Sequence, residues 1–165
     1  MGIALDNNAI RMPTSRVYLP SLKFLHVGEN NMTIDVHLHT QLLPNIAFLY
    51  LNGNHIESFP SESLKNTLLY LGIARCNLKS IPSYLSKFKH LKYLDARDNN
   101  ILDIDDGVRD LLKTNNVESY FSGNGVCMKD RSLDCEALCS ETCWSKNVAN
   151  DGICDASCSA KECQY

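Results

Sequence analysis

The sequence has little that would indicate binding to nucleic acid or insertion into a membrane. No block of Lys and Arg is present and the formal net charge is −3, whereas nucleic-acid binding relies on a basic face. No apolar run approaches the roughly 20 residues needed to span a bilayer. The first residues, MGIALDNN, lack the charged region and apolar core of a signal peptide. We therefore expect no nucleic-acid partner and no membrane insertion by these residues.

Catalytic motifs are missing as well. None of the five His residues lies in a recognised catalytic motif, and neither a Gly-x-Ser-x-Gly elbow nor a glycine-rich phosphate loop occurs. The segment GNG at 123–125 is not followed by a Lys or a helix signature, so it is interpreted as a turn. The sequence predicts a protein that is not an enzyme.

Cysteine, in contrast, is abundant near the C-terminal end. Seven of the eight cysteines fall between Cys127 and Cys163, and a short segment so rich in cysteine is typical of proteins from oxidising compartments. The sequon Asn31-Met32-Thr33 is compatible with that location and makes Asn31 a candidate glycosylation site. These features predict an extracellular location, as a secreted protein or the ectodomain of a membrane protein. They also predict that the natural protein extends before Met1, because an extracellular protein needs a signal peptide. The incomplete cysteine-rich tail described below predicts that it extends beyond Tyr165 as well.

An internal repeat of about 23 residues dominates residues 1–126. The pattern L-x-x-L-x-L-x-x-N/C-x-L is matched almost completely by residues 22–32, 46–56, 68–78 and 91–101, with weaker matches on either side. Its polar position recurs at intervals of 22, 24, 22, 23 and 25 residues, at Asn8, Asn30, Asn54, Cys76, Asn99 and Asn124. This pattern resembles that of the leucine-rich-repeat family.

The resemblance covers residues 1–126 and implies an α/β fold. This is a solenoid of about five to six coils, whose short L-x-L strands form one parallel, horseshoe-shaped sheet. Because side chains alternate along a strand, we expect Leu49, Leu71 and Leu94 to point inward. The asparagines are expected to satisfy backbone groups of neighbouring coils. Segments that begin with proline are expected to form short helical or extended returns on the convex side.

Two positions in the repeats invite a chemical interpretation. Cys76 stands in the place of an asparagine and is interpreted as a buried, unreactive thiol. His37 and His39, in a lengthened repeat, would share one face of a strand and could bind a metal together. No third ligand is recognisable nearby, so a solvated loop is the preferred interpretation.

The remaining strand residues would form columns on the concave side. The residue before the second Leu of the repeat is Phe or Tyr in each of the four full matches, which predicts a solvent-facing aromatic ladder. Phe and Tyr are typical anchors of protein interfaces. Stacking of these rings to stabilise the sheet is the alternative role. The residues that we expect to bind a protein ligand are Phe24, His26, Phe48, Tyr50, Tyr70, Tyr93, Asp95 and Arg97.

The C-terminal segment carries two further resemblances. Residues 127–138 resemble the C-terminal cap of extracellular leucine-rich-repeat proteins. Residues 139–165 resemble a Lin-12/Notch repeat that stops before its closing Asp-Gly-x-Asp-Cys motif. Connectivity cannot be deduced from cysteine spacing alone. Carried over by position, the resemblance leaves Cys154 without a partner and implies the disulfides Cys127–Cys135, Cys139–Cys163 and Cys143–Cys158.

Lin-12/Notch repeats also bind one calcium ion through carboxylates and backbone carbonyls. The resemblance implies an incomplete calcium site with Asp151, Asp155 and, more weakly, Asn150 as ligands. Alternatively, Asp151-Gly152 is simply a turn, or the regularly spaced cysteines of the tail bind zinc. No cofactor is expected in the solenoid.

These observations predict a protein-recognition module of a secreted or membrane-anchored protein, such as a receptor, which binds a protein ligand on its concave sheet. Two alternatives remain at this point. One is a structural protein whose repeats only space other domains. The other is an intracellular scaffold with a zinc-stapled tail.

Overall fold

A computed structural model describes residues 1–8, 18–35, 42–130 and 132–135 of the chain. The chain separates into two compact units, Met1–Cys135 and Glu136–Tyr165. The second unit lies outside the described residues. The Lin-12/Notch-like segment, with its disulfides and calcium ligands, therefore also lies outside them, as do His37 and His39.

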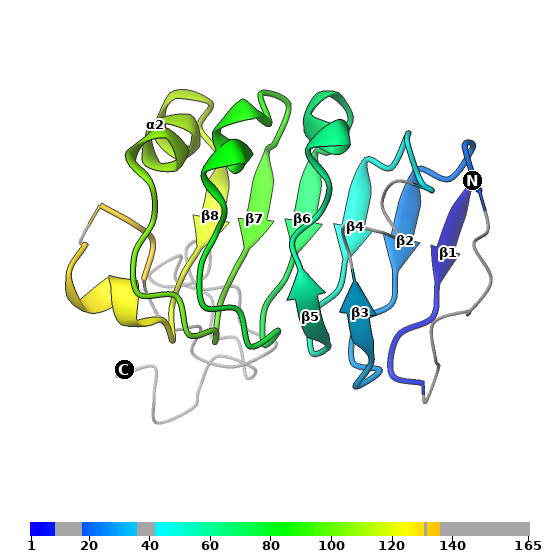
Figure 1. The fold of residues 1–165 in the computed structure, drawn as a ribbon, viewed down its shortest axis with the longest axis horizontal. Coiled ribbons are helices and arrows are strands. Elements are labelled where there is room, and N and C mark those ends of the chain that lie inside the picture. Colours follow the sequence, from blue (N-terminus) through cyan, green and yellow to red (C-terminus); the bar gives the residue numbers. More distant parts are fainter. Residues whose placement is uncertain (9–17, 36–41, 131, 136–165) are drawn as a thin grey trace, which may run out of the picture. The chain divides into compact units, whose positions relative to one another are not determined.

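Six short strands of the first unit form one parallel sheet, in which neighbours in the sequence are neighbours in space. Figure 1 shows them side by side, one for each coil of the chain. Leu25 pairs with Leu49, Leu49 with Leu71, and Leu71 with Leu94, without a shift in register. The strands are β1 (Gly2–Ala4), β2 (Phe24–His26), β4 (Phe48–Tyr50), β6 (Tyr70–Gly72), β7 (Tyr93–Asp95) and β8 (Glu118–Tyr120). This parallel α/β architecture is compatible with the leucine-rich-repeat solenoid expected from the sequence.

The repeated leucines form the core of this unit. Leu49, Leu71 and Leu94 are the central residues of their strands and are 1%, 0% and 0% exposed, which confirms that they point inward. One continuous apolar cluster extends along the coils from Leu22 to Val126. Because each coil contributes the same few apolar residues to this cluster, every coil covers the apolar edge of the next one.

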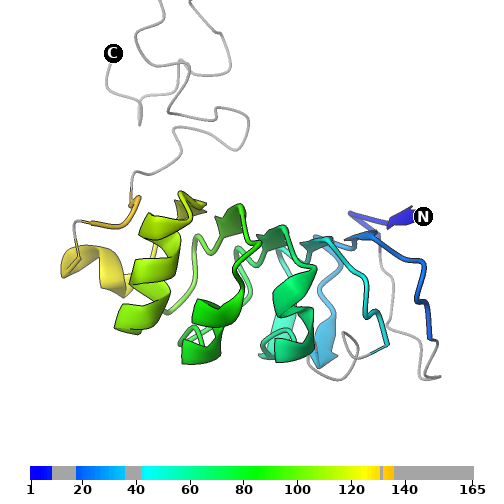
Figure 2. The same ribbon diagram turned by 90° about the horizontal axis from the view of Figure 1, so that it is seen from above.

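The return side of the coils is formed mainly by helical turns. Figure 2 shows η1 (Glu62–Asn66), η2 (Ser83–Lys87) and α2 (Asp106–Thr114) on the face of the sheet opposite its open side. Pro60 and Pro82 lie just before η1 and η2, which confirms that the proline segments lead into short helical returns. The buried residues of η1 and η2 are Leu64 and Leu85, which pack into the core.

The helix α2 is the longest element of the described residues and was not expected as a regular helix. It begins at the N-cap Asp105, whose side chain accepts a hydrogen bond from the backbone nitrogen of Gly107 at 2.9 Å. Val108, Leu111 and Leu112 are buried, as expected for the core-facing stripe of an amphipathic helix. The sequence signal was a capping aspartate followed by this helical spacing.

Two coils also pair on the return side. The strands β3 (Thr33–Asp35) and β5 (His55–Ser58) form a second, parallel sheet. Ile34 and Ile56 occupy its paired, buried positions. This sheet was not predicted, because only one apolar residue in each strand distinguishes it from an irregular return.

Buried asparagines link each coil to its neighbour. Asn54 donates from its amide nitrogen to the carbonyl oxygens of Val27 and Leu51, each at 2.9 Å, and its amide oxygen accepts from the backbone of Met32 at 3.0 Å. Asn30, Asn99 and Asn124 make equivalent bonds. The expected role of the asparagines, which is to satisfy backbone groups of neighbouring coils, is confirmed.

The end of the solenoid is tied by a disulfide between Cys127 and Cys135, the pair that the family resemblance implied. Cys127 belongs to the helical turn η3 (Gly125–Met128). The backbone nitrogen of Phe121 donates to the carbonyl oxygen of Asp134 at 2.7 Å, so Asp134 lies beside the residue that follows the strand β8. The disulfide therefore closes a short loop over the last coil.

Candidate functional site

The first residues of successive strands place their rings in line along the sheet. The ring centroids of Phe24 and Phe48 are 6.2 Å apart, those of Phe48 and Tyr70 are 4.9 Å apart, and those of Tyr70 and Tyr93 are 5.5 Å apart. The last two pairs are stacked at an interplanar angle of 22°. The unshifted parallel register produces this ladder, because equivalent residues face each other across every strand pair.

A second column of rings lies beside the first at the N-terminal end of the sheet. The imidazole of His26 meets the ring of Tyr50 edge-on at 4.7 Å, and Tyr50 also lies 6.1 Å from Phe24. We call the five half-buried rings on β2, β4 and β6 the aromatic patch: Phe24, His26, Phe48, Tyr50 and Tyr70. Each ring therefore contacts a neighbouring ring while keeping part of its surface exposed to solvent.

Two of the expected binding residues do not belong to this exposed surface. Tyr93 is 9% exposed and Asp95 only 2% exposed, so the expectation that Tyr93 faces solvent is wrong. The ring of Tyr93 lies between those of Tyr70 and Tyr120, at 5.5 and 5.7 Å, and this sandwich covers it. The side chain of Arg97 covers Asp95.

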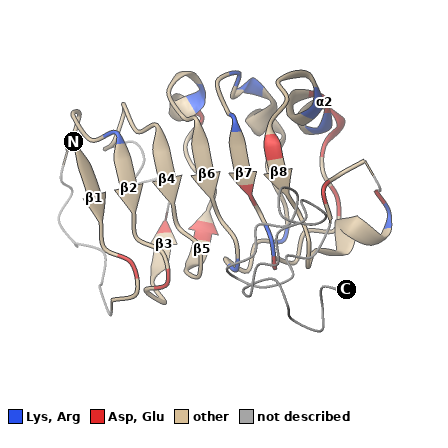
Figure 3. Cartoon of the chain, turned by 180° about the vertical axis from the view of Figure 1, so that it is seen from behind, with Lys and Arg blue, Asp and Glu red and all other residues tan. Residues whose placement is uncertain are grey.

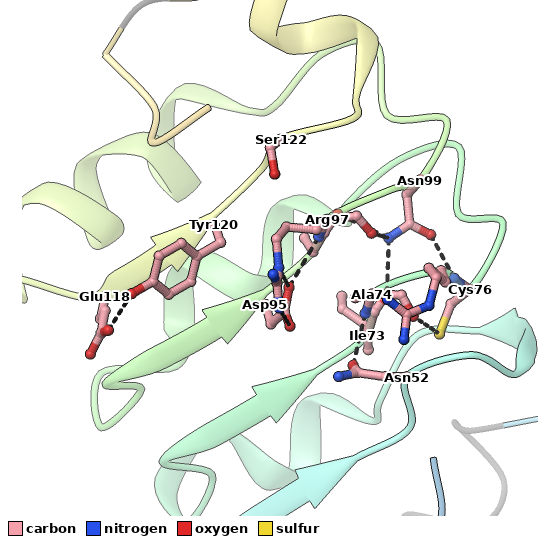
Figure 4. A network of polar contacts seen from close by, with 12 residues as sticks. Asn52, Ile73, Ala74, Cys76, Asp95, Arg97, Asn99, Glu118, Tyr120 and Ser122 are labelled. Carbon is pink, nitrogen blue, oxygen red and sulfur yellow. Dashed lines mark hydrogen bonds and ion pairs between the residues drawn. The ribbon is translucent and has the colours of Figure 1, made fainter. Parts of the chain in front are cut away.

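The contact between Asp95 and Arg97 is a two-pronged ion pair. The nitrogens Nε and Nη2 of Arg97 lie 2.7 Å from Oδ1 and Oδ2 of Asp95, respectively. Figure 4 shows this pair beside Tyr120, whose ring centroid lies 5.8 Å from Cζ of Arg97. Burial lowers the pKa of Arg97, but the hydrogen bonds and charge of Asp95 outweigh it and raise the pKa overall. Arg97 therefore remains charged, and its side chain is engaged by Asp95 within the sheet.

Gly72 interrupts the second column for a steric reason. A Cβ atom at this position would lie 2.9 Å from Cδ1 of Tyr50 and 2.9 Å from Oδ1 of Asn52. That oxygen accepts a hydrogen bond from the backbone nitrogen of Ala74 at 2.9 Å. The absence of a side chain at Gly72 thus leaves room for the side chains of Tyr50 and Asn52 next to its backbone.

Several residues of this face were missed by the sequence analysis. Asp6 accepts from the backbone nitrogen of Gly28 at 2.6 Å, and its other oxygen lies 2.5 Å from Nδ1 of His26. Glu29 and Arg75 form an ion pair of 2.5 Å, although 46 residues separate them. The signal that could have found both pairs is the column that each residue occupies in the repeat. Gly53 leaves room for Glu29 to reach Arg75, and Gly28 leaves room for Asp6.

Cys76 takes the place of an asparagine between two coils. Its thiol is fully buried and lies within donor distance of the carbonyl oxygens of Leu51 and Ala74, at 3.4 and 3.3 Å. These are the kinds of backbone acceptors that the asparagines use in other coils. Burial raises the pKa of the Cys76 thiol to about 12.

We expect Cys76 to be unreactive toward a thiol reagent such as DTNB in the folded chain at pH 8. A raised pKa keeps the reactive thiolate form scarce, and burial blocks access. Labelling located by peptide mass mapping would show Cys76 modified only after unfolding in denaturant. A Cys76→Ala variant is the control, and it should lose one labelled site only under unfolding conditions. Rapid labelling of Cys76 in the folded chain would contradict this expectation.

The structure adds little to the other candidate sites. Asn31 is exposed, with a φ of 51°, in the turn between β2 and β3, so its glycosylation stays a prediction. In the described ranges, no group of three or more His, Cys, Asp or Glu side chains is placed to hold a metal ion. The helices in this part of the chain are all too short or too polar to cross a membrane.

Comparison with known proteins adds two distant similarities. The chain is 30% identical over 84 residues to Receptor-like protein 47 of Arabidopsis thaliana, an alignment that covers 49% of this chain and 10% of that protein. It is 34% identical over 82 residues to a transmembrane protein of African swine fever virus, covering 48% of this chain and 25% of the viral protein. No family model matches the sequence. The chain thus spans a small part of each relative and is similar to a receptor-like protein over about half of its own length.

Proposed function

We propose that this chain is a non-catalytic recognition module of a secreted or membrane-anchored protein, and that it binds a protein partner on the open face of its six-stranded sheet. The observation that carries the proposal is the aromatic patch. Its rings form one contiguous surface, and all five are half-buried rather than enclosed. Partly exposed Phe and Tyr side chains bury a large area on binding at little cost in conformational entropy.

The support for an extracellular setting is independent of this surface. The Cys127–Cys135 disulfide is typical of an oxidising compartment. The similarity to a receptor-like protein agrees with a receptor ectodomain. The proposed partner is therefore a secreted or cell-surface protein, and we propose no substrate and no cofactor for the solenoid.

The test is capture of partners by the full chain with and without the patch. The double variant Phe48→Ser/Tyr70→Ser removes the two best-stacked rings of the patch. We expect at least a tenfold loss of affinity for the captured partner, because truncating even one central aromatic anchor costs about 2 kcal/mol or more and a tenfold loss corresponds to about 1.4 kcal/mol. The measurement is chemical cross-linking to cell surfaces followed by mass spectrometry, with the affinity of each hit measured by biolayer interferometry.

The matched control is Tyr84→Ser, on the return side of the coils. Tyr84 is also a half-buried aromatic residue, and its hydroxyl donates to the carbonyl oxygen of Pro60 at 3.1 Å. This variant should keep the partner. If the wild-type chain and the double variant capture the same proteins with the same affinity, the sheet face is not the binding surface and the spacer function is favoured.

A further inference from the structure

The charges of this chain are distributed unevenly. The open face of the sheet consists of the first and third residues of each strand and the second and third residues after it. These positions hold two basic residues, Arg75 and Arg97. They hold five acidic residues: Asp6, Glu29, Asp95, Asp98 and Glu118. Subtracting these from the 19 acidic and 16 basic residues of the whole chain leaves equal numbers of each. The net charge of −3 therefore resides formally on this face.

The acidic residues border the aromatic patch on both sides. Asp6 follows β1 and Glu29 follows β2. At the other end, Asp95 belongs to β7, Asp98 to the turn after β7, and Glu118 to β8. Figure 3 shows red segments at the end of β7 and at the start of β8. Glu118 and Asp98 are exposed. With strands about 4.8 Å apart, β4 and β8 are separated by roughly 14 Å.

The local electrostatics agree with this count. Burial raises the pKa of Tyr93 most, and Asp95 raises it further by more than Arg97 lowers it, with Glu118 adding to the effect. At the ring of Tyr93 the effect of the carboxylates therefore exceeds that of Arg97. Aromatic faces also attract cations, and the sheet already holds one such contact, between Arg97 and the ring of Tyr120.

We infer that the partner presents a basic and apolar surface to this face, with apolar side chains on the aromatic patch and Lys or Arg side chains toward Asp98 and Glu118. This inference rests on the proposed function and adds the chemistry of the partner. An acidic face selects basic partners by complementary potential, and it does so mainly through the rate of association. Rings and carboxylates together would hold a cationic side chain by its charge and its aliphatic stem.

The experiment is a selection of random twelve-residue peptides, displayed on phage, against the immobilised full chain. We expect the selected peptides to be enriched in Lys and Arg over Asp and Glu, and in apolar residues. In Asp98→Lys/Glu118→Lys, affinity for individual selected peptides should fall about tenfold at low salt, since the attraction is replaced by repulsion. Lys at position 98 is compatible with the turn, because Arg75 has the same place in its repeat, with φ values of 53° and 52°.

The matched control is Glu57→Lys/Asp110→Lys, which changes the net charge equally at exposed positions of β5 and α2. It should change affinity less than twofold. Peptides with the charge balance of the unselected library, or an equal effect of the two charge variants, would overturn the basic partner. If Phe48→Ser/Tyr70→Ser binds the selected peptides as tightly as the wild type, the proposed docking face itself is wrong. If the wild type selects no peptide above an uncoated surface, this inference is overturned. The proposed docking face is not, because a folded partner can bury a larger area than a peptide of twelve residues.

Discussion

Replacing Asn99 with Ala is expected to lower the free energy of unfolding by about 3–5 kcal/mol, because several buried backbone groups lose their partner at once. Its amide nitrogen donates to the carbonyl oxygens of Ile73, Ala96 and Arg97 at 2.9, 2.9 and 3.0 Å. Its amide oxygen accepts from the backbone nitrogens of Cys76 and Leu78, both at 3.0 Å. Figure 4 shows this side chain bridging two coils. Folded domains are stable by only about 5–15 kcal/mol, so this loss would be severe.

Urea unfolding followed by circular dichroism measures the change. The matched control is Asn100→Ala, since the neighbouring side chain is exposed and makes one hydrogen bond, to Asn77 at 2.7 Å. It should change stability by less than about 0.5 kcal/mol. Asn99→Cys should fall between the two, because Cys76 shows that a thiol can occupy this slot. A loss below about 1 kcal/mol in Asn99→Ala would mean that water replaces the amide without cost.

Replacing Asp95 with Ala is expected to cost about 3 kcal/mol of stability, for a different reason. The side chain of Arg97 is only 13% exposed, so removing Asp95 leaves a largely buried guanidinium without its carboxylate. The expected loss exceeds the net contribution of the pair, because the charge of Arg97 stays largely removed from water after the carboxylate of Asp95 that compensates it is gone.

A double-mutant cycle tests this explanation. Asp95→Ala/Arg97→Met, which removes both charges and keeps an apolar stem, should be more stable than Asp95→Ala alone. Thermal unfolding of the four proteins gives the coupling energy. If the two substitutions are additive, the pair contributes no more than its separate contacts. The exposed pair Glu29 and Arg75 is the comparison, and its Glu29→Ala variant should lose less than about 1 kcal/mol.

The repeat pattern was sufficient to predict which residues form the core and how the strands pair. Leu49, Leu71 and Leu94 recur at the same place in each coil, so one local pattern determines the inward face of every strand. The buried asparagines follow from the same argument, because the turn after each strand leaves the same backbone groups to be satisfied. The pairing of strands in chain order required only that successive coils stack.

The exposure of the site residues was decided by the tertiary structure. Tyr93 and Phe48 occupy equivalent positions, yet Tyr93 is buried between Tyr70 and Tyr120 whereas Phe48 keeps exposed surface. The difference depends on side chains from three coils at once, and no single repeat contains that information. The sheet formed by β3 and β5 escaped prediction for the same reason, since its strands gain their partners only when two returns meet.

The sequence by itself therefore determined the parallel solenoid, its leucine core and the line of aromatic residues, because these depend on short-range spacing repeated along the chain. Only the tertiary structure decided that Asp95 is enclosed with Arg97 and that Glu29 reaches Arg75 across the intervening coil. Such contacts depend on the size of the residues between the partners. They also depend on the rotamers that those neighbours leave open, and neither is encoded within one repeat.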